Sequence, residues 1–160
     1  MFFHYQGFVP SSLKKKFSKF KFFANINLTI WLPNKNLNMP NTALILCGGL
    51  GTRLHSVSGN SPKCLMKVNG RPFLLYLLDL LKSNHFQDVV LCTGHGHDQI
   101  QKEIGSKYKG SSIKYSRENS PLGTGGAIVQ ASKELESDWF LVMNGDSYCS
   151  FNLKAHSLKM

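Results

Sequence analysis

The sequence has few cysteines and no long hydrophobic run, and each shortage excludes a class of protein. The longest apolar-rich stretch, Phe73–Leu81, is interrupted by Asp79 and is much shorter than the roughly 20 residues that a membrane-spanning helix needs. The cysteines are widely separated, and their spacing argues against a zinc site or a disulfide scaffold and suits reduced thiols. We therefore expect a cytoplasmic protein without a membrane span. The four cysteines are Cys47, Cys64, Cys92 and Cys149.

Acidic residues are also scarce, nine against 19 basic ones, which gives a net charge of +10. The excess is uneven: residues 1–40 hold six lysines and no Asp or Glu, whereas residues 41–160 hold 13 basic and nine acidic residues. Residues 41–160 are therefore only mildly basic, which suits a site for phosphorylated small molecules and does not call for nucleic acid. With 160 residues, the chain is long enough for one domain with a substantial core.

Residues 1–40 differ in kind from the rest of the chain. They contain seven of the 11 phenylalanines, and residues 14–23 alternate basic and aromatic side chains. One interpretation is an arm that binds a membrane surface or RNA. No structural period is evident, however, and Met39 offers a natural start of translation just before the first strand. We therefore expect residues 1–40 to be a disordered, basic, Phe-rich extension of a domain formed by residues 41–160.

From residue 42 onward, short apolar runs alternate with helical patterns. A continuous apolar run such as Thr42–Cys47 is typical of a strand buried on both faces of a sheet. Strands that alternate with helices pair in parallel through crossover connections. The sequence therefore predicts an α/β fold, with a Rossmann-like, mostly parallel sheet and helices on both faces. The strands are expected at 42–47, 88–93, 112–116 and 139–143, and the helices at 72–82, 98–104 and 124–135.

A glycine-rich loop, Gly48-Gly49-Leu50-Gly51-Thr52-Arg53-Leu54, follows the first predicted strand. Ligands of such sheets bind beyond the carboxyl ends of the strands. Glycines let the backbone approach closely, so consecutive N–H groups can hold a phosphate, and the Arg53 guanidinium suits phosphate oxygens. The loop matches neither the Walker A motif nor the dinucleotide fingerprint.

Three further motifs follow the glycine-rich loop along the chain. Lys63 lies in Ser61–Pro72, just before an apolar helix, and a second glycine-rich segment spans Pro121–Ala127. Asp146 comes after the last predicted strand, within Asn144-Gly145-Asp146. A carboxylate oxygen is a ligand that Mg²⁺ prefers, and Mg²⁺ offsets phosphate charge. The sequence therefore predicts a phosphate and magnesium site at the carboxyl edge of the sheet.

In this order, the four motifs resemble those of the sugar-1-phosphate nucleotidylyltransferases, whose pattern is GGxGTRL followed by PKxLxxVxGxPxL. The resemblance covers about residues 42–153, and Cys64 stands where many members have proline. It implies the nucleotide-diphospho-sugar transferase type of fold. Members of the family continue well past the Asn-Gly-Asp strand, so we expect residues 41–160 to be the N-terminal part of a C-terminally truncated domain.

The resemblance also implies the site residues and the reaction. A sugar 1-phosphate attacks the α-phosphorus of a nucleoside triphosphate, which gives a nucleotide sugar and pyrophosphate. The catalytic residues would be Arg53, Lys63 and Asp146, and Asp146 would also be the ligand of Mg²⁺. The nucleotide would be bound by Leu46, Gly48, Gly49, Gly51, Thr52, Arg53, Leu122, Gly123, Thr124 and Gly125.

Within the family, residues 68–74, 121–128 and 144–148 are most similar to the D-glycero-D-manno-heptose 1-phosphate guanylyltransferases. This favours GTP and heptose 1-phosphate as substrates, in the synthesis of cell-surface polysaccharide such as lipopolysaccharide. Mannose-1-phosphate guanylyltransferases and glucose-1-phosphate thymidylyltransferases share most of these residues, so both remain alternative functions. A homo-oligomer is also possible from the sequence. From another class, a non-catalytic nucleotide-binding remnant also stays open.

One other pattern suggests a metal, the His-x-His of Gly94-His95-Gly96-His97-Asp98. It lies between a predicted strand and a predicted helix, where Asp98 can act as the helix cap. A third ligand is not evident in the sequence, and a zinc site needs at least three protein ligands. We therefore favour a loop without a metal.

Overall fold

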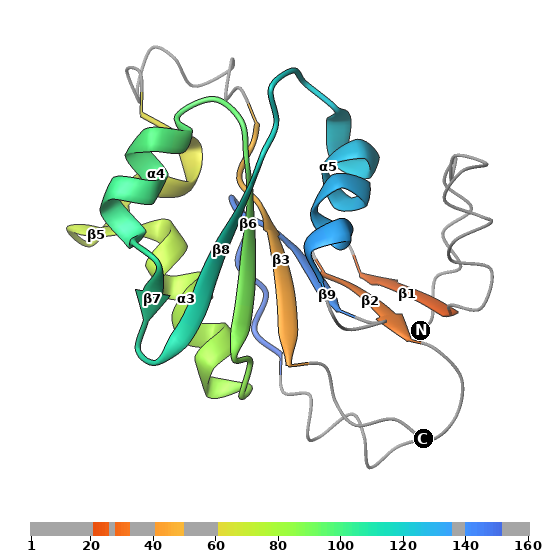
Figure 1. Ribbon diagram of the computed structural model, residues 1–160. Helices are drawn as coiled ribbons and strands as arrows, with labels where there is room; N and C mark the ends of the chain where they lie inside the picture. Colours follow the sequence, from red (N-terminus) through yellow and green to blue (C-terminus); the bar gives the residue numbers. More distant parts are fainter. Residues whose placement is uncertain (1–20, 26–27, 33–40, 50–60, 136–139, 152–160) are drawn as a thin grey trace.

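The computed structural model describes residues 21–25, 28–32, 41–49, 61–135 and 140–151. Within these ranges, the chain forms a mixed seven-stranded sheet with helices on both faces (Figure 1). The order of the strands is β1-β2-β9-β3-β6-β8-β7, and a separate hairpin is formed by β4 and β5. The predicted α/β class is thus confirmed.

Four adjacent strands make the parallel centre of the sheet. They are β9 (Leu141–Asn144), β3 (Thr42–Leu46), β6 (Asp88–Thr93) and β8 (Ser111–Arg117). All four were predicted: β6 has the expected bounds, and the ends of the other three differ by at most two residues. Their registers bring the carboxyl ends to one edge of the sheet, because Leu46 pairs with both Cys92 and Asn144, and Thr93 pairs with Arg117.

The helices cover the two faces of the sheet unequally. Helices α3 (Phe73–Ser83) and α4 (His97–Ile104) lie on one face, and α5 (Gly123–Ala131) lies on the other (Figure 1). The helix predicted to reach residue 135 ends at Ala131 and continues as a 3-10 turn, Ser132–Glu134.

Helix α4 begins differently from the prediction, which made Asp98 its cap. Its N-cap is Gly96, whose φ of 74° lies in the left-handed region, and no side chain caps the helix. Asp98 lies inside the first turn, where its Oδ1 is 3.5 Å from Nη1 of Arg117. Glycine reaches that φ without the steric cost that other residues carry, so the chain turns into the helix one residue before Asp98.

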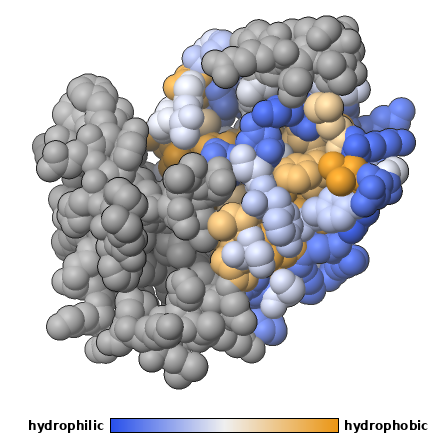
Figure 2. Space-filling model, turned by 180° about the vertical axis from the view of Figure 1, so that it is seen from behind, coloured by the Kyte–Doolittle hydropathy of each residue, from blue (hydrophilic) through white to orange (hydrophobic). Residues whose placement is uncertain are grey.

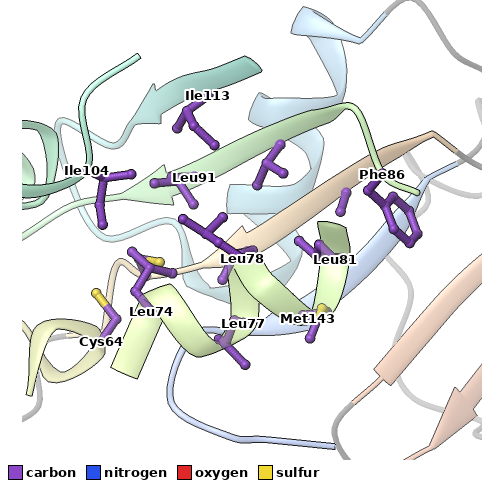
Figure 3. Close-up of a cluster of buried hydrophobic side chains, with 14 of the residues drawn as sticks. Cys64, Leu74, Leu77, Leu78, Leu81, Phe86, Leu91, Ile104, Ile113 and Met143 are labelled. Atoms are coloured by element: carbon purple, nitrogen blue, oxygen red, sulfur yellow. The ribbon is translucent and has the colours of Figure 1, made fainter. Parts of the chain in front are cut away.

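The hydrophobic core forms two clusters because successive residues of a buried strand face opposite sides of the sheet. Ala43 and Ile45 belong to the cluster under α3 and α4, whereas Leu44 belongs to the cluster under α5. In the larger cluster, α3 contributes four leucines that are at most 2% exposed (Figure 3). These four residues are Leu74, Leu77, Leu78 and Leu81.

A short hairpin precedes α3. Strands β4 (Lys67–Val68) and β5 (Arg71–Pro72) are joined by Asn69 and Gly70, whose φ values are 49° and 77°. Two successive residues with positive φ are the mark of the type I′ turn that closes tight hairpins, and Asn-Gly is its preferred sequence. The hairpin connects the segment that carries Lys63 to the start of α3.

Within residues 1–40, the structure differs from the expectation of disorder at two segments. β1 (Lys21–Asn25) and β2 (Leu28–Leu32) form an antiparallel hairpin, and β2 pairs antiparallel with β9. The edge of β9 offers unpaired backbone groups on which a further strand can form, and the sequence Leu-Thr-Ile-Trp-Leu favours a strand. Residues 1–20, 26–27 and 33–40 lie outside the described residues, and a domain boundary at residue 41 stays a prediction.

A cluster of polar side chains ties α3 to the hairpin before it and to β7 (Lys107–Tyr108). Asp79 of α3 accepts hydrogen bonds from Tyr108, Lys109 and Arg71; the Oδ1–Oη distance to Tyr108 is 2.9 Å, and both Oδ–nitrogen distances are 2.7 Å. Burial raises the pKa of Asp79, but these three hydrogen bonds outweigh it and leave that pKa below its usual value. The carboxyl group is therefore ionised at neutral pH.

We predict that Asp79→Asn removes part of the pH dependence of stability. A lowered pKa in the folded state contributes stability that is fully present above the unfolded value of about 3.9 and is lost as the pH falls through the folded value. At pH 7 the variant should be less stable by about 0.5–1 kcal/mol, because the group is one-third exposed. Urea unfolding at pH 7 and near pH 2.5 measures this, and equal losses for both proteins on acidification would contradict it.

Few large hydrophobic side chains are exposed among the residues that the structure describes. Seen from behind, the coloured part of the surface is largely hydrophilic at its rim, with smaller hydrophobic patches toward its middle (Figure 2). Large hydrophobic side chains that are exposed in the described ranges are Val68, Leu122 and Tyr148. Among the same residues, none of the helices is both long enough and apolar enough to cross a bilayer.

Candidate functional site

The segments predicted to bind nucleotide and metal meet at the carboxyl edge of the parallel strands. Leu46 ends β3 and is followed by Gly48 and Gly49, and Asn144 ends the neighbouring β9. These ends are held together because the N–H of Gly145 donates to the carbonyl of Leu46, with an N–O distance of 2.9 Å. Asp146 therefore emerges beside the start of the glycine-rich loop.

Gly145 is the residue that permits this close approach. A Cβ atom at this position would lie 2.8 Å from the carbonyl oxygen of Leu46 and 3.0 Å from Sγ of Cys47. Any other residue would thus push β9 and β3 apart at the point where they deliver Asp146. Close packing against β3 thus explains the Gly in Asn144-Gly145-Asp146.

Lys63 and Asp146 form an ion pair at the carboxyl edge of the sheet. The distance from Nζ to Oδ2 is 2.7 Å, and the two side chains are 42% and 40% exposed. The second oxygen, Oδ1, accepts a hydrogen bond from Oγ of Ser147 at 3.0 Å. The hydrogen bond from Lys63 lowers the pKa of Asp146 most, burial works against it, and Ser147 adds to the lowering. Asp146 is therefore an anionic, accessible carboxylate.

The backbone around Lys63 is fixed although its side chain is exposed. Lys63 begins a 3-10 turn, Lys63–Leu65, in which the N–H of Leu65 donates to the carbonyl of Pro62 at 2.9 Å. The Pro62 ring is buried against Gly96, where a Cβ atom would overlap it. The loop before α4 thus supports the segment that presents Lys63, which gives Gly96 a packing role besides its positive φ.

Two buried thiols lie under this part of the site. Cys64 and Cys47 belong to the same hydrophobic cluster, and Cys64 lies next to Leu74 of α3 (Figure 3). A hydrogen bond with Cys64 and burial together raise the pKa of Cys47 well above its usual value. A thiol with a raised pKa is a poor nucleophile. Cys47 therefore has a packing role, as the sequence predicts.

The second glycine-rich segment forms the start of α5. Leu122, Gly123 and Thr124 are exposed, and a Cβ atom at Gly123 or Gly125 would meet none of the other described residues within 4 Å. The first N–H groups of a helix have no partner within the helix, and such groups can bind an anion or a sugar hydroxyl. Gly126 differs, because its Cβ atom would lie 2.6 Å from Cβ of Leu122.

Glu118 lies beside the predicted site, and the sequence interpretation gave it no role. It directly follows β8, and its N–H donates to the carbonyl of Thr93 at 2.7 Å. Its Oε2 accepts from the N–H of Leu122 at 3.0 Å, and a Cβ atom on Gly48 would lie 2.8 Å from its Oε1. The carboxylate therefore lies between the two glycine-rich segments. Its position just past the end of a parallel strand was the signal that could have identified it.

The donor set around Asp146 fits a magnesium ion that is shared with a ligand. In the described part of the chain, no three His, Cys, Asp or Glu residues are grouped so as to hold a metal by themselves. Mg²⁺ commonly binds through one or two carboxylates, with water and substrate phosphates as its other ligands. Asp146 meets that requirement. In the other candidate motif, Nδ1 of His97 lies 2.8 Å from Oγ1 of Thr93, an internal contact of the loop.

The predicted site is described only in part. Leu46, Gly48, Gly49, Lys63, Asp146 and residues 122–125 are brought to the same edge of the sheet. Gly51, Thr52 and Arg53 lie outside the described residues. The roles in binding and catalysis assigned to all of these residues stay predictions.

Comparison with known proteins finds relatives of this chain. The model of the nucleotidyl transferase family matches residues 42–158. The D-glycero-alpha-D-manno-heptose 1-phosphate guanylyltransferase of Aneurinibacillus thermoaerophilus is 40% identical over 112 residues, which are 70% of this chain and 49% of the relative. The enzyme of the same name from Campylobacter jejuni is 38% identical over 118 residues, which are 74% of this chain and 52% of the relative.

The crystal structure of HddC from Yersinia pseudotuberculosis is similar to this fold, with a TM-score of 0.66 and 39% sequence identity. The match covers 74% of this chain and 53% of HddC, which has also been crystallised in complex with GMP-PN. The chain thus spans about half the length of the relatives that it matches. The family match over residues 42–158 and the shared fold establish that the chain belongs to the nucleotidyl transferase family.

Proposed function

We propose that this chain supplies the nucleotide-binding part of an enzyme that transfers GMP from GTP to D-glycero-D-manno-heptose 1-phosphate and releases pyrophosphate. The observation that carries the proposal is the 38–40% identity to two heptose 1-phosphate guanylyltransferases. The Lys63–Asp146 pair beside the glycine-rich loop supports it, because it places a cation and a metal-binding carboxylate where phosphates would lie. The product would serve the synthesis of cell-surface polysaccharide, such as lipopolysaccharide, in the cytoplasm.

The position of Glu118 supports guanine as the base. A carboxylate repels phosphate, so the end of the nucleotide that lies near Glu118 is more favourably the base. Guanine offers two neighbouring donors, N1–H and the 2-amino group, and a carboxylate can accept from both. Uracil and thymine offer a single N–H between two carbonyl oxygens, which a carboxylate disfavours. Oε1 of Glu118, which lies against Gly48, is the oxygen that we expect to face the base.

The chemistry requires positioning and charge neutralisation more than covalent catalysis. An oxygen of the sugar phosphate attacks the α-phosphorus, and pyrophosphate leaves with the electron pair of the broken P–O bond. Lys63 and Arg53 would hold phosphate oxygens and stabilise the charge that develops on them. Asp146 would hold Mg²⁺, which when bound supplies charge neutralisation at the phosphates. Leu46, Gly48, Gly49, Gly51, Thr52 and residues 122–125 would bind and orient the nucleotide.

The experiment below also distinguishes two alternative functions. Mannose 1-phosphate is the alternative sugar substrate, because mannose-1-phosphate guanylyltransferases share the same motifs. A nucleotide-binding remnant without turnover is the alternative of another class, because the chain spans about half of its relatives.

The test measures binding and turnover separately on the 160-residue chain. Calorimetric titration with GTP, ATP, UTP and dTTP in the presence of Mg²⁺ should give the tightest binding for GTP. Pyrophosphate release should then be fastest with GTP and heptose 1-phosphate, and slower with mannose 1-phosphate or glucose 1-phosphate. GTP binding without release of pyrophosphate would support the remnant. Absence of binding to any of the four nucleotides would contradict the proposal.

A further inference from the structure

We propose that the Lys63 ammonium keeps divalent metal away from Asp146 until a triphosphate draws the lysine to itself, so that metal and nucleotide bind together. The proposal rests on the function proposed above and adds that binding of the metal depends on binding of the nucleotide. Its starting observation is the ion pair between Lys63 and Asp146. Lys63 would thus have two alternating partners, Asp146 and the triphosphate.

Both oxygens of Asp146 already have hydrogen-bond donors. Oδ2 is 2.7 Å from Nζ of Lys63, and Oδ1 is 3.0 Å from Oγ of Ser147. Mg²⁺ binds a carboxylate oxygen at 2.0–2.1 Å, so an ion on Oδ2 would lie a few ångströms from the ammonium. The repulsion between a single and a double positive charge at that distance lowers metal affinity by about tenfold, even with the screening of water and salt.

Lys63 can leave Asp146 without any rearrangement of the backbone. Its side chain is 42% exposed, so no packed core holds the ammonium in place. The backbone is fixed by the 3-10 turn, in which the N–H of Met66 also donates to the carbonyl of Lys63 at 3.1 Å. A lysine on a flexible stem is a common phosphate ligand. The movement required is therefore a change of rotamer toward the phosphates of the nucleotide.

This exchange of partners by Lys63 would couple the binding of metal to the binding of nucleotide. The described residues contain no group of three metal-binding side chains, so by themselves these residues offer the ion few ligands. A triphosphate removes the competing ammonium and adds phosphate oxygens at the same time. Because coupling between two ligands is reciprocal, the metal must raise nucleotide affinity by the same factor. Without Lys63, the part of this coupling that comes from the ammonium disappears.

The test uses Mn²⁺ as the probe, because its binding is followed directly by electron paramagnetic resonance without any assay of activity. We expect Lys63→Met to bind Mn²⁺ about tenfold more tightly than the wild type in the absence of nucleotide. The matched control is Lys67→Met, which removes the same charge from an exposed lysine of β4 and should change the affinity less than twofold. Adding Asp146→Asn to Lys63→Met should abolish the gain.

The same Mn²⁺ titrations, repeated with a bound non-hydrolysable GTP analogue, measure how strongly nucleotide changes the metal affinity of each variant. Bound nucleotide should tighten Mn²⁺ binding by a larger factor in the wild type than in Lys63→Met. Equal Mn²⁺ affinities of nucleotide-free wild type and Lys63→Met would overturn this proposal, as would a gain that persists in the double variant. Neither result depends on turnover. Failure of the wild type to bind any nucleotide would instead overturn the proposed function, while the nucleotide-free titrations would still decide this inference.

Discussion

Asp146→Asn should lower the rate of nucleotidyl transfer by about 100-fold or more and barely change the stability of the fold. The substitution keeps the shape of the side chain but removes the hard anionic oxygen that we assign to Mg²⁺. Loss of one preorganised electrostatic contact to a reacting group typically costs about 10²–10³ in rate. The ion pair with Lys63 is also lost, but it is about 40% exposed, so the cost in free energy of unfolding should stay below about 1 kcal/mol.

Steady-state release of pyrophosphate and urea unfolding measure the two effects on the same preparation. Asp88→Asn is a matched control, because Asp88 begins β6 at the opposite end of the parallel strands, and it should leave the rate unchanged. Ser147→Ala, which removes the hydrogen bond to Oδ1, should have a smaller effect than Asp146→Asn. A rate within a few-fold of the wild type for Asp146→Asn would show that the metal is held elsewhere.

The part of the fold that sequence could predict is the part in which burial decides the structure. β6 has five buried residues in succession, and α3 buries leucines on one side. Such patterns are typical of a strand covered on both faces and of a helix packed against a core. The pairing of β2 with β9 carries no such signal, because an edge hairpin depends on an unpaired strand distant in sequence. For that reason, the sequence interpretation did not predict the strands at residues 21–25 and 28–32.

The candidate site could likewise be predicted from the sequence only in part. Its motifs could be located from the sequence because ligands bind at the carboxyl ends of parallel strands. The contact between Lys63 and Asp146 could not, because 83 positions separate the two residues and their distance depends on how Gly145 packs against Leu46. Glu118 was overlooked because a single carboxylate beside a glycine-rich segment resembles an ordinary surface residue. Only its contacts with Gly48 and Leu122 distinguish it.

Phe86→Ala should have the largest effect on stability, lowering the free energy of unfolding by about 3–5 kcal/mol. Phe86 is fully buried where α3 turns into β6, at the far end of the cluster from Cys64 (Figure 3). Removing a buried aromatic ring loses its transfer free energy and leaves a cavity. Domains of this size are stable by only about 5–15 kcal/mol, so the variant should unfold at far lower urea concentration.

The partly buried Phe73 at the start of α3 provides the matched control, and Phe73→Ala should cost clearly less because less of its ring leaves water on folding. Phe86 lies at the end of the sheet opposite the nucleotide site, since the neighbouring Gln87 donates to the carbonyl of Asn41, before β3. At low temperature the folded fraction of Phe86→Ala should therefore bind GTP as tightly as the wild type, unlike a variant of the site. Urea titration and calorimetry check the two parts of this prediction. A decrease in the free energy of unfolding below about 1 kcal/mol would show that the Phe86 ring is not tightly packed in the cluster under α3. A loss of GTP affinity in the folded fraction would show that packing at this end of the core affects the nucleotide site.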